Sequence, residues 1–233
     1  MRIKLILLSL VTLLLLNSAC TKDEETVPEV KLTEAQLDFI DFFKQVAISG
    51  TAIRKWNSRM DLFIEGNPTD AHLAKTLQTI NTINSLATDG FSIRLVSDAS
   101  SANINIFFGS RKDYNSIYEG TYPSTSSTSI GQFSTRYRND FTIDNGAIWV
   151  DTTTPVPAFQ EGTILHELTH SIGFLNHAVG RLSVINYSVR NETITDYTAM
   201  DLRLIKFLYH PSMLAGLTAD EVDKLLKEML LAE

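Results

Sequence analysis

The stretch His166-Glu167-Leu168-Thr169-His170-Ser171-Ile172-Gly173-Phe174-Leu175-Asn176-His177 decides how this chain folds and what it can bind. On a helix, His166 and His170 lie four residues apart on one face and can offer imidazole nitrogens to one point. Two neutral imidazoles about 2.0–2.1 Å from a common ion make half of a zinc site. Glu167 is then placed to deprotonate a water on that ion. Gly173 is expected to end the helix, because glycine reaches the left-handed conformation that turns the chain.

The third metal ligand is predicted to be His177. Neutral imidazole suits zinc better than the amide oxygen of Asn176, which is one alternative. An acid elsewhere, such as Asp196, is another. Three protein ligands leave one position open for water, and Glu167 would serve as the general base for hydrolysis. His166, His170, His177 and Glu167 therefore predict a catalytic Zn²⁺ site.

The same residues resemble the metzincin zinc metallopeptidases, whose pattern is HExxHxxGxxH. The chain departs from the pattern at the eleventh position, where Asn176 precedes His177. A second likeness lies in Ser183-Val184-Ile185-Asn186-Tyr187, which resembles the Met-turn form Ser-x-Met-x-Tyr with Ile185 in place of Met. The resemblance implies that Tyr187 reaches the zinc or the oxyanion. Met200 is the alternative Met-turn residue, but its place in a capped first helical turn argues against it.

The resemblance implies an α+β, zincin-like fold with a mixed sheet and an active-site helix. It also implies a zinc metalloendopeptidase that takes a protein or peptide substrate. Two other functions stay open: a non-catalytic binding lipoprotein that keeps the fold, and a zinc hydrolase of non-peptide bonds. The presence of Glu167 argues against the first, since a purely structural metal site needs no base.

The N-terminus is predicted to be a lipoprotein signal. Arg2 and Lys4 precede an apolar run that is too short for a spanning helix, and small residues lead into Cys20. Residues 1–19 are the predicted signal peptide, residues 20–32 a flexible tether after lipidated Cys20, and residues 33–233 the catalytic domain. The expected location is the outer membrane, with the domain periplasmic or exposed at the cell surface.

The composition of the chain limits which partners and metal ligands can be expected. The chain has 233 residues, of which 44% are hydrophobic and 20% charged, as in ordinary globular proteins. Without Arg2 and Lys4 it keeps 18 basic against 27 acidic residues, a net charge of −9. Such a charge disfavours nucleic acid as a partner. With its only cysteine committed to lipid, the chain has no disulfides and no cysteine metal ligands.

Local patterns predict the elements around the zinc helix. Capping boxes predict helices that begin near Thr33, Thr198 and Thr218, and Thr69 or Asn67 caps a further helix with His72 on its surface. The zinc helix is expected to start near Glu161, after two prolines. The remaining expectations are strands at 53–64, 91–96 and 103–108, a long surface loop at 120–140, and a hairpin within 143–150 that turns at Asp144-Asn145-Gly146. A helix, a strand, a helix and several strands before the zinc helix indicate an α+β order.

Overall fold

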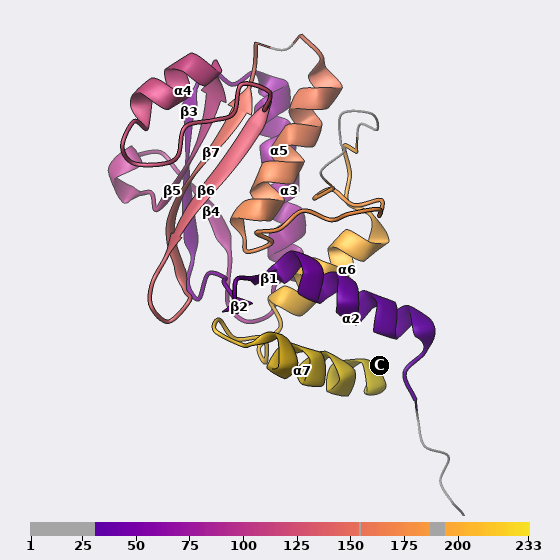
Figure 1. Ribbon diagram of the computed structural model, residues 1–233. Coiled ribbons are helices and arrows are strands. Elements are labelled where there is room, and N and C mark those ends of the chain that lie inside the picture. Colours follow the sequence, from indigo (N-terminus) through magenta and orange to yellow (C-terminus); the bar gives the residue numbers. More distant parts are fainter. Residues whose placement is uncertain (1–30, 154, 187–193) are drawn as a thin grey trace, which may run out of the picture. The chain divides into compact units, whose positions relative to one another are not determined.

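The core of the protein is a five-stranded sheet with the order β4-β3-β5-β7-β6 (Figure 1). The computed structural model describes residues 31–153, 155–186 and 194–233. The strands are β3 (Met60–Gly66), β4 (Ile93–Val96), β5 (Ile104–Gly109), β6 (Gly131–Tyr137) and β7 (Ile143–Asp151). The first four in spatial order are parallel, and β6 pairs antiparallel with β7 at one edge. A mixed sheet combined with helices was expected and is confirmed.

Six α-helices are found among the described residues. They are α2 (Glu34–Ala47), α3 (Asp70–Leu86), α4 (Arg111–Ile117), α5 (Pro157–Ser171), α6 (Ala199–Leu208) and α7 (Ala219–Leu231). A two-stranded ribbon, β1 (Ile48–Ser49) with β2 (Ala52–Ile53), follows α2, and the 3-10 helix η1 (Ala99–Ser101) precedes β5. Leu32–Glu233 forms one compact unit. Within the described residues, no helix is long and apolar enough to cross a membrane.

Alternation along the central strands builds two separate cores. Successive side chains of a strand point to opposite faces of a sheet. Ile106 and Ile148 belong to the large core that contains the apolar residues of α5, whereas Phe107 and Trp149 pack with Tyr114 of α4. Figure 1 shows α3 and α5 side by side along the sheet. The helix α5, which carries His166 and His170, therefore packs against the larger core.

Three sequence-based expectations for the sheet region are wrong. Residues 120–140 are not all loop, because β6 occupies Gly131–Tyr137. No turn lies at residues 144–146; β7 runs straight through them, and the β6–β7 turn is formed by residues 138–142, where Phe141 has a φ of 66°. Gly146 instead allows close strand approach, since an added Cβ would lie 2.8 Å from the Ser134 carbonyl oxygen. The strand expected at 53–64 is interrupted: β2 ends at Ile53 and β3 begins at Met60.

Two further corrections concern helices and burial. The zinc helix begins at Pro157 and not near Glu161, because proline fits the first helical position, where no N–H is needed. His72 is not a surface residue: it is 4% exposed and stacks on Phe108. Its Nδ1 accepts from the Thr69 N–H, and its Nε2 contacts Gln160 on α5. The short helix α4 was not anticipated.

Candidate metal centre

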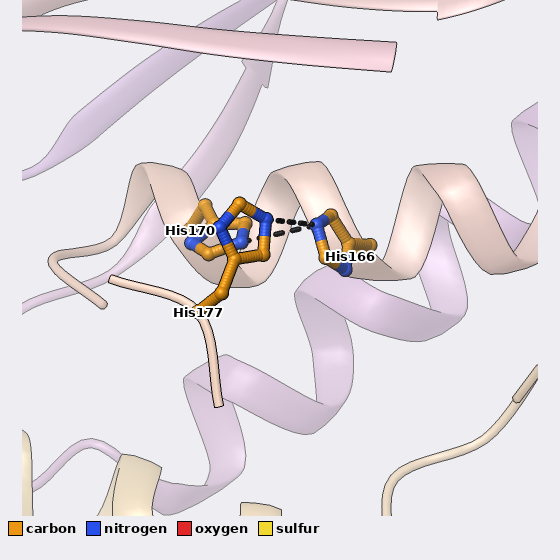
Figure 2. A group of neighbouring side chains, drawn as sticks. All are labelled: His166, His170 and His177. Atoms are coloured by element: carbon orange, nitrogen blue, oxygen red, sulfur yellow. Dashed lines mark hydrogen bonds between the residues drawn. The ribbon is translucent and has the colours of Figure 1, made fainter. Parts of the chain in front are cut away.

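Two elements bring the three histidines together. His166 and His170 lie on α5, and His177 follows it after a tight turn at Gly173. Gly173 has a φ of +126°, and an added Cβ would lie 2.5 Å from the Arg54 carbonyl oxygen. Both the conformation and the close approach require glycine at this position. The turn lets the chain reverse and carry His177 back to the helix (Figure 2).

The spacing of the imidazole nitrogens fits a single ion. His170 Nε2 lies 3.0 Å from His166 Nε2, which lies 3.3 Å from His177 Nε2. Candidate ligand atoms of the three residues all lie within 4.8 Å of one another. Ligands about 2.05 Å from a tetrahedral zinc ion are about 3.3 Å apart. Among the described residues this is the one group of three or more His, Cys, Asp or Glu side chains with metal-ligand spacing.

Backbone carbonyls fix which nitrogen of each helix histidine carries the proton. His166 Nδ1 lies 2.6 Å from the Val184 carbonyl oxygen, and His170 Nδ1 contacts that of Phe174. A carbonyl oxygen only accepts, so both Nδ1 atoms donate, and in the neutral rings both Nε2 atoms carry bare lone pairs. Metal-binding histidines typically have this arrangement. The two Nε2 atoms lie 3.0 Å apart with no proton between them, so a bound cation would stabilise this arrangement.

Burial keeps these rings neutral. The pKa of His166 is lowered to about 4, mainly by burial and to a smaller extent by the neighbouring His177, while the hydrogen bond to Val184 acts in the opposite direction. The pKa of His170 lies well below its usual value, first because of burial and then because of the two other histidines. Burial also lowers the pKa of His177. Neutral imidazole is the form that binds a metal.

The strand β6 covers the helix at this point. Phe133 stacks on the His170 ring, with centroids 4.5 Å apart and an interplanar angle of 9°. Gly131 lies against Glu167 and Thr163: an added Cβ would be 2.7 Å from Glu167 Oε1 and 2.4 Å from Thr163 Cγ2. Burial raises the pKa of Glu167 to about 8. The glycine thus leaves room for a buried carboxyl group that can gain and lose a proton near neutral pH.

A buried acid supports the metal-type site from behind. Asp201, 1% exposed in the first turn of α6, accepts a 2.5 Å hydrogen bond from Ser183 Oγ and a 3.3 Å bond from the Val184 N–H. Val184 in turn accepts from His166. Asp201 is therefore connected to His166 through the backbone of a single residue, Val184, whose N–H binds Asp201 and whose carbonyl oxygen binds His166. The sequence pattern predicted Asp201 only as the capping partner of Thr198. It predicted no role in the site for Gly131, Phe133 or Phe174.

The other predicted site residues fall in different places. The Asn176 amide donates to the Gln45 and Ile48 carbonyl oxygens at the end of α2, and Asp196 pairs with Lys75, so neither joins the histidine cluster. Met200 lies in the first turn of α6, and Ile185 is fully buried. Tyr187 and Cys20 lie outside the described residues.

Comparisons with known proteins give a family and a distant likeness. The family described as "Protein of unknown function (DUF2927)" matches residues 35–228. No curated protein sequence matches the chain. Among solved structures, "Structure of myroilysin" is similar at 13% identity over 69% of this chain and 98% of that chain, with a TM-score of 0.40.

Proposed function

The chain belongs to the family of proteins of unknown function DUF2927, and from its histidine site we propose that it is a zinc-dependent metallopeptidase. One observation carries the proposal. The Nε2 atoms of His166 and His170 lie 3.0 Å apart, and both carry lone pairs because the Nδ1 protons are donated to carbonyl oxygens. An all-nitrogen set of three ligands with a fourth position to spare is typical of a catalytic zinc ion.

His166, His170 and His177 would hold the ion. When bound, zinc supplies Lewis-acid chemistry that activates water and polarises a carbonyl group. Glu167 takes the proton of the attacking water and delivers it to the nitrogen of the leaving amine, as the C–N bond of the substrate breaks. Tyr187, outside the described residues, is proposed as the donor to the oxyanion on the strength of the metzincin resemblance.

We assign the domain to the zincin type, close to the metzincins. The proposal is supported by HExxH on a buried helix, a glycine turn after it, and a third histidine that returns to the first two. The displacement of that histidine by one residue is absorbed by Asn176, whose side chain binds the end of α2. We further propose that Cys20 is acylated, that residues 1–19 are a signal peptide, and that the protein is an outer-membrane lipoprotein.

A panel of variants tests the metal and the chemistry together. Wild type should purify with one zinc per chain and cleave members of a peptide library. Glu167→Gln should keep the zinc and lose about 10²–10⁴-fold of the rate, the usual range for a general base. His170→Ala and His177→Ala should lose zinc. Asn176→Ala is the control that should keep it, because its amide binds backbone and not the ligand cluster.

Metal content by mass spectrometry and folding by circular dichroism are measured on every variant. A folded wild type that takes up no zinc would reject the site. Stoichiometric zinc without any difference in cleavage between wild type and Glu167→Gln would favour the binding lipoprotein instead. Cleavage of ester or amide libraries but not of peptides would favour a hydrolase of non-peptide bonds.

A further inference from the structure

The segment that joins His177 to the Asp201-bound Val184 carries two unusually exposed apolar side chains. Val179 is 71% exposed and Leu182 is 62% exposed, the highest values among the large hydrophobic residues that the structure describes. Gly180 lies between them with a φ of +69° and no atom near the position of an added Cβ. Single exposed apolar residues need no explanation, but two at the tip of one turn beside a metal-type site call for one.

This turn is held firmly at its base. Arg181, between the two apolar residues, makes two hydrogen bonds to the carboxylate of Asp38 on α2, one of them 2.5 Å long. Its guanidinium lies 4.9 Å from the centre of the Phe42 ring. The Ala178 N–H donates to the Ile185 carbonyl oxygen over 2.8 Å. The polar groups of the turn thus point to the protein, and Val179 and Leu182 are displayed to the outside.

The turn lies beside the place where the chain enters the domain. Figure 1 shows the orange segment after α5 close to the first half of α2, in indigo. Asp38 is only six residues beyond Leu32, where the compact unit begins. Leu32 lies twelve positions after Cys20 in the chain, and twelve extended residues span at most about 40–43 Å. A lipid on Cys20 would therefore limit how far the start of the domain, and the turn close to it, can lie from the bilayer.

We propose that Val179 and Leu182 dip into the interface of the phospholipid bilayer that holds Cys20. The inference rests on the lipid anchor proposed above. The contact is apolar, since the mature chain, with 18 basic and 27 acidic residues and a net charge of −9, gains nothing from anionic headgroups. His177 is two residues from Val179, so the metal-type site is held at the membrane surface. Its substrates are then polypeptide segments that lie on or project from the same membrane.

Nitroxide labels on the mature, lipidated protein in zwitterionic phospholipid vesicles test the contact. Acylation blocks the Cys20 thiol, so Val179→Cys and Leu182→Cys each carry a single reactive site. Leu214→Cys is the matched control, because Leu214 is 60% exposed on a different loop, after α6. The spin relaxation of the nitroxides at positions 179 and 182 should be accelerated more by oxygen, which enters lipid, than by a water-soluble nickel chelate. The nitroxide at position 214 should respond more to nickel. About 0.5 M salt should leave this contrast unchanged.

Every other outcome overturns the proposal. Equal nickel access at all three positions places the turn in water. Line broadening between labelled copies that disappears on dilution with unlabelled protein makes the turn an interface between copies. If the labels at 179 and 182 are shielded from nickel only when a peptide ligand of the histidine site is added, the turn is a wall of the substrate cleft. A free Cys20 thiol on the mature protein removes the anchor. The comparison of oxygen and nickel access, made without added ligand, needs neither zinc nor turnover, so its failure is distinct from failure of the peptidase proposal.

Discussion

At the scale of single residues, the metal-type site depends on groups that never touch the metal position. Val184 and Phe174 supply carbonyl oxygens that orient the His166 and His170 rings. Asp201 fixes the peptide of Val184 by accepting from its N–H, and also accepts from Thr198 and Ser183. Such outer hydrogen bonds hold a histidine in the tautomer and orientation that a metal requires.

We expect Asp201→Asn to weaken zinc binding by about 10–100-fold, the usual effect of losing such a partner. The amide places a donor where the carboxylate accepts from N–H and O–H groups, so the Ser183-Val184 segment shifts and His166 with it. Zinc affinity is measured by competition with a calibrated chelator, and thermal stability in parallel. Asp220→Asn is the control, since Asp220 is an exposed acid in the first turn of α7. Unchanged zinc affinity together with lower stability would mean that Asp201 only caps α6.

At the scale of elements, the pairing of β6 with α5 shapes the site. The edge strand brings Gly131 against Thr163 and Glu167 and lays Phe133 on His170. A helix can present histidines by itself, but the burial that raises the pKa of Glu167 needs neighbouring segments, and Gly131 of β6 is one of them. The environment of Glu167, the proposed general base, therefore depends on both α5 and β6.

Gly131→Ala should lose about 1–3 kcal/mol of stability, a typical cost of overpacking, and most of the hydrolytic rate, while it keeps zinc. The new methyl group meets both Thr163 Cγ2 and Glu167 Oε1. Adding Thr163→Ser removes the first clash and leaves the second. Urea unfolding should then recover while the rate stays low. Recovery of both stability and rate in the double variant would contradict a role for Gly131 in placing Glu167.

At the scale of the whole molecule, the protonation of Glu167 is coupled to the stability of the fold. Glu167 has a folded-state pKa of about 8, against 4.5 as its ordinary value, so the folded chain holds a proton that the unfolded chain releases. Stability from this group is present at low pH and is lost as pH rises from 4.5 through about 8. Histidines shift in the opposite direction, but above pH 7 they are neutral in both states.

Chelator-treated wild type should therefore lose about 1 kcal/mol more stability between pH 7 and pH 9 than chelator-treated Glu167→Gln. The free energy of unfolding is measured with urea at several pH values. Added zinc should remove the difference, because a nearby cation favours the ionised carboxylate. Parallel pH profiles of the two metal-free proteins would show that Glu167 is not protonated in the folded state.

The sequence alone determined the features that depend on near neighbours in the chain. Thr33 with Gln36, Thr198 with Asp201, and Thr218 with Glu221 form the capping boxes that their spacing predicted, and the helices begin there. The same holds for His166 and His170, whose four-residue spacing places them on one face of α5. Interactions within one helical turn follow from spacing because the local geometry is fixed.

Only the tertiary structure decided the features that depend on distant partners. The strand β6 has little apolar alternation because it is an edge strand, and it forms because β7 offers a ladder. His72 is buried because Phe108 and Gln160, far along the chain, pack against it. His177 and not Asn176 joins the cluster because the end of α2 occupies the Asn176 amide. Spacing cannot encode such contacts, since they arise only when separate segments meet in the folded chain.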